Sequence, residues 1–143
     1  MREGLAWHRE RQSEMDALGG ASELYVEKPD HSTKATSGYH KVDHYSERKR
    51  RVYSMKHTQL ADIALETAKG YLREAEAKYS PGTKIASVPS TPVEMRGRRL
   101  KGRLFLLVPV QSKSVPTEVL KYAKQLDIMI IDQNGKIYSE HDQ

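Results

Sequence analysis

Three polar residues within residues 39–57 (YHKVDHYSERKRRVYSMKH) are spaced so that they could act together on a phosphodiester bond. The pattern predicts two short strands joined by a charged turn at residues 47–50. If this hairpin has no bulge, Asp43 faces Ser54 across the strands, with Cβ atoms about 5 Å apart. Lys56 follows two residues later and therefore lies on the same face of the sheet. The sequence thus predicts an acid, a hydroxyl and an ammonium group on one patch of sheet.

This combination is suited to metal-dependent hydrolysis of a phosphodiester. Asp43 can bind a divalent metal ion, and Lys56 can hold the attacking water or the scissile phosphate and stabilise its negative charge. Ser54 stands where a second carboxylate could, but its oxygen is a weaker metal ligand. A further acid is therefore required, and we expect it in the N-terminal helices. The candidates, in order of preference, are Glu23, then Glu14 and Glu27.

Composition limits the class of protein and its partners. The chain has 143 residues, which fits one domain, and its formal net charge of +5 favours an anionic partner such as nucleic acid or an acidic protein. The absence of cysteine excludes disulfides, a thiolate nucleophile and a zinc finger. No apolar run approaches the roughly 20 residues that span a bilayer, and residues 1–20 are too charged for a signal peptide. A glycine-rich phosphate loop, an HExxH helix and a nucleophile elbow are also absent.

Apolar periodicity predicts the elements that position the polar groups. Steps of three and four residues indicate helices, whereas short apolar runs between turn residues indicate strands. The predicted helices are a segment within 1–20 ended by Gly19-Gly20, a short helix or turn at 21–28, a long helix at 59–79 closed by Pro81-Gly82, and a helix from Pro116 to Leu126. The predicted strands besides the hairpin are 84–88, 104–108, 127–132 and 136–138, the last two joined by an Asn134-Gly135 turn.

The order of these elements predicts an α/β (α+β) domain around one mixed sheet. Residues 30–38 and 89–99 have the composition of loops. The run at 104–108 is apolar throughout, which is typical of a strand buried on both faces. Pro109 cannot donate to a ladder, so we expect this strand at a sheet edge or bulged at that point.

Several segments resemble one family of nucleases. Residues 39–43 (YHKVD) and 52–60 (VYSMKHTQL) resemble the nuclease toxin domains at the C-terminal tips of contact-dependent growth inhibition effectors, which belong to the PD-(D/E)xK, restriction-endonuclease-like superfamily. The segments 78–85 (KYSPGTKI), 106–111 (LLVPVQ) and 132–138 (DQNGKIY) are similar to the same subgroup. The resemblance extends from about Glu23 to Tyr138, and its most specific part is the block from Asp43 to Leu60.

The resemblance implies a restriction-endonuclease-like mixed sheet flanked by helices and a DNase that uses a divalent metal, zinc in this subgroup. The active site it implies consists of Glu23, Asp43, Ser54 and Lys56, with Glu23 and Asp43 as metal ligands. Ser54 replaces the acid usual in the superfamily motif, which leaves Mg²⁺ as an alternative to zinc. The resemblance further implies a domain at the C-terminal end of a larger secreted effector, delivered into the cytoplasm of a neighbouring bacterium.

The resemblance also implies a cognate immunity protein that neutralises the toxin. In this subgroup a protruding hairpin adds strands to the sheet of the immunity protein, and residues 84–110 are the counterpart expected here. Basic residues in that segment favour an acidic partner. The expected contact residues are Val88, Val93, Arg96, Arg98 and Leu100.

Two basic clusters fit a nucleic-acid substrate, because phosphate contacts supply most sequence-independent affinity. No pattern for base readout is visible, so we expect weakly selective cleavage. One cluster is the hairpin turn with Arg48, Lys49, Arg50 and Arg51, and the other contains Arg98, Arg99 and Lys101, with Arg96 and Arg103 nearby.

Three alternatives remain at this stage. His40 would face His57 on the other side of the predicted hairpin, and such a pair could cleave RNA without a metal. A metal-dependent RNase with the same active site is also consistent with the sequence. Finally, the domain could bind nucleic acid or an acidic protein through its basic surface without catalysis.

Overall fold

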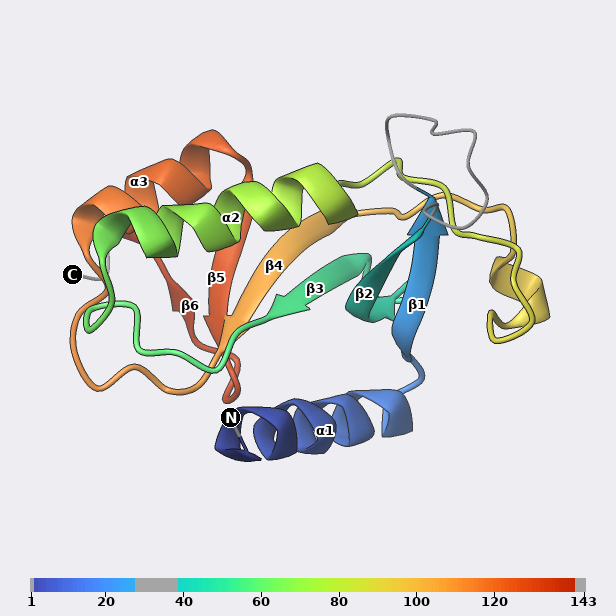
Figure 1. Ribbon diagram of the computed structural model, residues 1–143, viewed down its shortest axis with the longest axis horizontal. Coiled ribbons are helices and arrows are strands. Elements are labelled where there is room, and N and C mark those ends of the chain that lie inside the picture. Colours follow the sequence, from blue (N-terminus) through green and yellow to red (C-terminus); the bar gives the residue numbers. More distant parts are fainter. Residues whose placement is uncertain (1, 28–38, 141–143) are drawn as a thin grey trace.

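The computed structural model describes residues 2–27 and 39–140, which form one mixed β-sheet with helices on both faces (Figure 1). In this described part the sheet has six strands arranged in sequence order. β1, β2 and β3 pair antiparallel, β3, β4 and β5 pair parallel, and β6 returns antiparallel to β5. The strands are β1 (Ala21–Glu27), β2 (Tyr39–Ser46), β3 (Arg51–Met55), β4 (Arg103–Val108), β5 (Ile128–Asp132) and β6 (Ile137–Tyr138). The α+β class predicted from the order of elements is therefore confirmed.

The parallel connections determine where two of the helices lie. α2 (Leu65–Tyr79) connects β3 to β4, and α3 (Thr117–Gln125) connects β4 to β5. Both crossovers step in the same direction along the sheet, so right-handed connections place both helices on the same face. α1 (Arg2–Ala17) packs on the opposite face (Figure 1). The helix predicted within residues 1–20 and the helix predicted from Pro116 are thus both confirmed.

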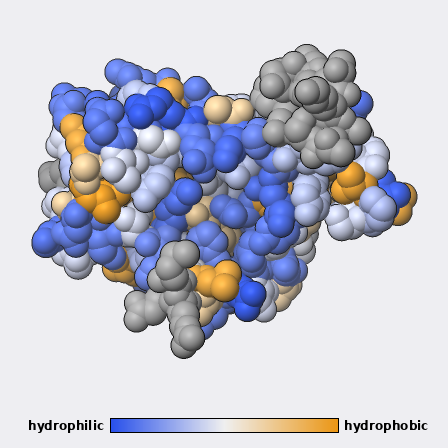
Figure 2. Space-filling view, in the orientation of Figure 1, coloured by the Kyte–Doolittle hydropathy of each residue, from blue (hydrophilic) through white to orange (hydrophobic). Residues whose placement is uncertain are grey.

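The apolar core is divided into two layers by the sheet. The larger layer lies under α2 and α3 and contains Val52, Leu72 and Leu106, and the smaller one contains Trp7 of α1 together with Tyr53. Residues 104–108 of β4 are buried throughout, as their apolar composition predicted. On the face shown in Figure 2, hydrophilic residues predominate and the apolar ones form small separate groups. Among the helices described, none is both long and apolar enough to cross a membrane.

The hairpin predicted within residues 39–57 is present, and the pairs next to its turn have the predicted register. Residues 47–50 form the turn, and His44 pairs with Tyr53, Tyr45 with Val52, and Ser46 with Arg51. This is the unbulged pairing that the sequence predicted. It places residues 43 and 54 at the next position, where β2 and β3 begin to separate.

The helix or turn predicted at 21–28 is wrong, because residues 21–27 form β1. The strand is stabilised by its pairing with β2 and by burial of Leu24 and Val26. Its partner strand is separated from it in sequence by the predicted loop at 30–38, which lies outside the described residues. Tertiary pairing therefore decided the conformation of this segment.

Two further predicted boundaries are wrong. The helix expected from residue 59 begins at Leu65, because the Leu60 backbone N–H donates to the Gln111 side chain (2.8 Å) and Gln59 also bonds the loop after β4. The strand expected at 84–88 is reduced to two single bridges, Val26 with Ile85 and Lys84 with Arg99. Both segments bond to partners distant in sequence, which local periodicity does not reveal.

The hairpin expected over residues 84–110 is not formed as one unit. β4, which supplies its second half, lies between β3 and β5 inside the sheet. Pro109 directly follows this central strand, so the edge position expected for the strand is also wrong. Instead, residues 83–100 form a loop whose two sides are joined by backbone hydrogen bonds between Thr83 and Leu100 and between Ile85 and Arg98.

Candidate active site

Asp43 lies in β2 at the point where β2 separates from β3. Its Oδ2 accepts a hydrogen bond from the Met55 backbone N–H (2.7 Å), and its backbone oxygen accepts one from Gln12 Nε2 of α1 (2.8 Å). The carboxylate thus bonds to the residue that follows Ser54, as expected from the predicted register. Hydrogen bonds from Met55 of β3 and from Gln12 of α1 together fix the position of Asp43.

Burial raises the pKa of the Asp43 carboxyl group above its ordinary value. The nearby Glu23 carboxylate also raises this pKa, whereas the Met55 N–H, His8 and Lys56 lower it. A carboxylate whose charge is poorly solvated gains more from a bound cation than an exposed one does. Asp43 is therefore a candidate cation ligand.

Glu23 lies opposite Asp43 in the register between β1 and β2. The ladder pairs Ser22 with His44 and Leu24 with Val42, so Glu23 and Asp43 stand between the same two pairs. Glu23 adopts a positive φ of 55°, which interrupts the regular pleat at this position. Its side chain is 54% exposed and lies 3.9 Å from Lys41 Nζ.

The other two candidate acids lie elsewhere. Glu14 pairs with Arg11 on α1 (3.3 Å), and Glu27 pairs with Lys84 at the far end of β1 (3.8 Å). The geometry therefore favours Glu23 as the partner of Asp43, although on a strand instead of a helix.

Lys56 is positioned by α2, the helix that covers this face of the sheet. Its backbone N–H donates to Leu107 of β4 (3.0 Å), and its Nζ lies 3.4 Å from Glu74 Oε1 and 4.9 Å from the centre of the Tyr71 ring. The side chain remains 29% exposed. The Lys56 side chain thus lies between a carboxylate and an aromatic face while remaining accessible to an anion.

Ser54 is buried within the sheet. It pairs with Leu106 of β4 and is 2% exposed. A hydroxyl in this position can orient a neighbouring group or a water but presents little surface to a substrate. Of the four predicted catalytic residues, Ser54 is the one least open to solvent.

Two residues on α2 belong to the site but were not identified from the sequence. Burial raises the pKa of the Tyr79 hydroxyl, and the nearby carboxylates of Asp43, Glu74 and Glu23 raise it further. Tyr79 therefore remains a neutral hydrogen-bond donor beside three acids. The apolar periodicity that predicts the helix at 59–79 indicates burial alone, and only the tertiary structure shows the ion pair of Glu74 with Lys56 and the electrostatic effect of the acids on Tyr79.

In the described ranges, no group of three or more histidine and acidic side chains is close enough to hold a metal ion. Asp43 and Glu23 stand opposite each other in the register of β1 and β2, so they are the candidate pair of carboxylates for a cation, with water as the remaining ligands. Glu23 also lines a polar pocket of about 220 Å³ that includes Asp16, Ser22 and Thr91. The pocket gives the exposed carboxylate of Glu23 access from solvent.

The predicted pairing of His40 with His57 is not part of the described ladder. The β2–β3 pairing ends at His44 and Tyr53, and His40 pairs with Val26 of β1 instead. His57 follows β3 and its ring lies 5.6 Å from the ring of Trp7 in α1. Because β2 and β3 separate before these positions, the predicted pairing of His40 with His57 does not form.

The two predicted basic clusters occupy adjacent surface segments. Arg48, Lys49 and Arg50 are exposed in the turn, and the Arg51 guanidinium lies 4.6 Å from the centre of the Phe105 ring. In the second cluster, Arg98 pairs with Glu47 (3.0 Å), Arg99 donates to the Gly82 carbonyl (2.8 Å), and Lys101 is exposed.

The expected immunity-contact residues do not form one surface. Leu100 is 1% exposed and belongs to the core, so it cannot contact a partner. Val93 is 74% exposed, whereas Val88 is half-buried. Arg96 donates to the carbonyls of Pro89 and Thr91 and thereby stabilises its own loop.

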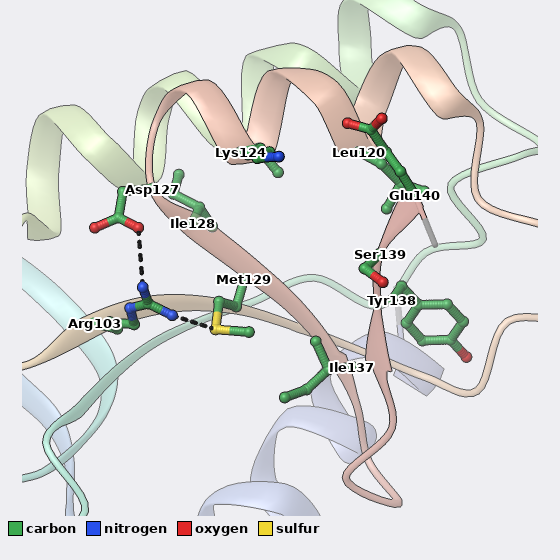
Figure 3. Close-up of a pocket in the computed structure, with 11 residues that line it drawn as sticks. Arg103, Leu120, Lys124, Asp127, Ile128, Met129, Ile137, Tyr138, Ser139 and Glu140 are labelled. Atoms are coloured by element: carbon green, nitrogen blue, oxygen red, sulfur yellow. Dashed lines mark hydrogen bonds and ion pairs between the residues drawn. The ribbon is translucent and has the colours of Figure 1, made fainter. Parts of the chain in front are cut away.

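A larger pocket lies away from these residues. A cavity of about 420 Å³ is formed by α3, β5 and β6 (Figure 3), and the four predicted catalytic residues do not line it. Arg103 at its rim bonds both Asp127 (3.7 Å) and the Met129 sulfur (3.2 Å). The candidate active site is therefore assigned by its chemistry and not by the size of its pocket.

Comparison of the chain with protein-family models, with curated proteins and with solved structures found no match.

Proposed function

We propose that the protein is a metal-dependent endonuclease that hydrolyses DNA and acts as an antibacterial toxin. The observation that supports catalysis most directly is the partly buried carboxylate of Asp43, which lies opposite Glu23 in the register of β1 and β2 and has a raised pKa. A carboxyl group whose pKa is raised by burial costs folding free energy, and such groups gather at functional sites. The resemblance of residues 39–60 to nuclease toxin domains supports the reaction class and the biological role.

The residues present fit a divalent cation bound by two carboxylates and several waters. Mg²⁺ is commonly held in this way, whereas zinc sites usually have three or four protein ligands. Two carboxylate ligands would suit Mg²⁺, whereas the resemblance implies zinc, so both metals enter the test. When bound, such an ion would supply positive charge at the phosphate and lower the pKa of a coordinated water.

The remaining groups position and stabilise the substrate. Lys56 binds a non-bridging oxygen of the scissile phosphate and compensates its developing negative charge. Glu74 and Tyr71 hold the Lys56 side chain in place (3.4 Å and 4.9 Å). Tyr79 donates a hydrogen bond to a water or a phosphate oxygen beside Asp43.

The test is digestion of plasmid DNA and total tRNA by the purified protein after chelation, with Mg²⁺ or zinc added back. We expect DNA cleavage that requires the metal and is abolished in Asp43→Ala and Lys56→Ala. Asp62→Ala and Lys113→Ala are matched controls, because this exposed ion pair (2.8 Å) lies outside the site. They should retain activity.

The other outcomes separate the competing functions. Cleavage of tRNA alone would identify an RNase, and cleavage that persists in chelator would exclude the metal mechanism. Binding of nucleic acid without turnover would indicate a non-catalytic module. Full activity of Asp43→Ala would refute the proposed site.

The toxin role is tested separately by inducible expression in bacteria. We expect growth arrest with degraded chromosomal DNA for the natural sequence and normal growth for Asp43→Ala. A protein that rescues growth and binds the purified domain would be the immunity partner.

A further inference from the structure

The two basic clusters, separated by about 50 positions in the sequence, are joined into one surface by backbone contacts. The Arg103 N–H donates to the Arg50 carbonyl (3.0 Å), and the Lys101 N–H donates to the Tyr45 hydroxyl (3.1 Å). Gly102 lies between them with a φ of +99°, and a Cβ at this position would collide with the Arg50 carbonyl. Glycine is therefore required for the close approach of the two segments. We call this surface the basic ridge, which comprises Arg48, Lys49, Arg50, Arg51, Arg98, Arg99, Lys101 and Arg103.

The positive charges of the basic ridge are only partly compensated within the described part of the chain. Glu47 pairs with Arg98 (3.0 Å) and Asp127 pairs with Arg103 (3.7 Å). No ion pair is found there for the exposed side chains at 48–50 and at Lys101. Concentrating like charges destabilises a folded protein, and a polyanionic partner removes that cost.

The basic ridge lacks the exposed aromatic rings on which single-stranded bases stack. Tyr45 and Tyr53 are buried, and Phe105 is buried beneath Arg51. Among described residues, the exposed large hydrophobic side chains lie outside the basic ridge, at Leu5, Leu18, Tyr39, Leu65, Val93 and Val110. Cations without stacking platforms favour the phosphates of a duplex over single strands.

The basic ridge and the candidate active site lie at opposite ends of β3. Arg51 begins the strand and Lys56 follows it, so five residues at about 3.3 Å each separate the two by about 16 Å. Successive phosphates of one DNA strand are about 3.4 Å apart along the helix axis, so this length corresponds to about five nucleotides.

We propose that the basic ridge binds the sugar–phosphate backbone of duplex DNA about five nucleotides from the bond that is cleaved. This inference rests on the proposed nuclease function and assigns its substrate form. It also explains why the turn of the hairpin and the segment before β4 are held together so closely.

The test uses Asp43→Asn protein with chelator, so that binding is measured without cleavage. Fluorescence anisotropy is recorded over a range of salt concentrations with a 20-base-pair DNA duplex, its separate strands, an RNA duplex of the same sequence and polyglutamate. The ridge variant carries Arg48→Gln, Lys49→Gln and Lys101→Gln. The matched control carries Lys113→Gln, Lys121→Gln and Lys136→Gln, which removes the same charge from residues outside the basic ridge.

We expect the DNA duplex to bind most tightly. The ridge variant should lower the slope of log K against log salt by about 2 to 3, because each lost phosphate contact removes about 0.9. The control should keep the original slope. Equal slopes for both variants, tighter binding of single strands or RNA duplex, or preference for polyglutamate would overturn the proposal.

Failure of this inference is distinguishable from failure of the proposed function. If the ridge variant, with Asp43 intact, cleaved DNA with unchanged efficiency at every salt concentration, the basic ridge would have no role in substrate binding. The proposed nuclease function would still stand. If the protein with its natural sequence bound the duplex tightly but did not cleave it, the proposed nuclease function would be refuted and the proposed binding surface would be supported.

Discussion

Asp43 in β2 is partly buried and Asp132 at the end of β5 is buried, and the two carboxylates are held in different ways. Asp132 accepts hydrogen bonds from the backbone N–H groups of Asn134 (2.8 Å) and Lys136 (3.1 Å) and from the Tyr138 hydroxyl (2.8 Å). Asp43 accepts one, from Met55 (2.7 Å), and burial raises its pKa. The carboxylate of Asp132 is satisfied by the turn that it organises, whereas that of Asp43 retains capacity for a ligand.

The same contrast separates the two halves of the sheet. The parallel half, β3 to β5, is apolar on both faces and carries α2 and α3. The antiparallel half, β1 to β3, contains Asp43 opposite Glu23 and the buried His44. We infer that the parallel half contributes most of the stability and that the antiparallel half provides the chemistry.

The largest expected effect is on activity in Asp43→Asn. Loss of the charge that would hold the cation should reduce DNA cleavage at least about 100-fold. The same change should not lower the free energy of unfolding at neutral pH. The pKa of Asp43 is higher in the folded than in the unfolded state, so ionisation of this carboxyl group at neutral pH favours unfolding, and removing the charge removes that cost. Plasmid cleavage and urea unfolding measure the two effects, and a loss of both would make Asp43 a structural residue like Asp132.

Asp132→Ala should have the opposite effect. Removing three hydrogen bonds, and with them the acceptor of the Tyr138 O–H, should lower the free energy of unfolding by about 3 kcal/mol. Cleavage per folded molecule should be retained at a temperature below the transition. If cleavage were lost from fully folded protein, the division between the two halves would be wrong.

Two of the buried tyrosines, Tyr79 and Tyr138, allow the same comparison with smaller expected effects. Tyr79→Phe should reduce cleavage about tenfold with little change in stability, because its hydroxyl lies among the acids of the site. Tyr138→Phe should lower stability by about 1 kcal/mol and leave cleavage unchanged, since its hydroxyl bonds Asp132 and the Gln111 N–H. Equal effects of both changes on cleavage would contradict the assignment of Tyr79.

The smallest effect is a pH dependence of stability from His44. Burial lowers the pKa of its imidazole below 6.5, the ordinary value. The unfolded state therefore binds a proton at a higher pH than the folded state, so stability falls as the pH decreases below about 6.5. Urea midpoints from pH 5 to 8 should show this slope, and His44→Gln should reduce it. A slope unaffected by the substitution would assign it to other groups.

How far the sequence predicts this molecule depends on whether the signal is local. The β2–β3 turn and its register follow from residues within one hairpin, so Asp43, Ser54 and Lys56 could be related correctly. β1 could not be recognised as a strand, because its stability comes from β2. The start of α2 was displaced for the same reason, since the Gln111 side chain bonds the Leu60 N–H across 51 positions.

The site was likewise predicted only where its parts are close in sequence. Glu23 was named among three acids, and the pairing of β1 with β2 is what places it opposite Asp43. Glu74 and Tyr79 lie on a helix whose periodicity indicates burial alone. Their relation to Lys56 and Asp43 depends on how α2 crosses the sheet, which residue spacing does not encode.

The bond from Gln12 to the Asp43 backbone has a consequence for shortened forms of the protein. α1 contributes little to the larger apolar layer, yet its side chain reaches the strand that carries the principal acid (2.8 Å). A version that begins at Gly19 would retain the packing of α2 and α3 but would lose the hydrogen bond from α1 to the middle of β2. If the proposed function is correct, such a version would lose cleavage while remaining folded, and the N-terminal helix would be a place where activity is controlled at a distance from the proposed catalytic groups.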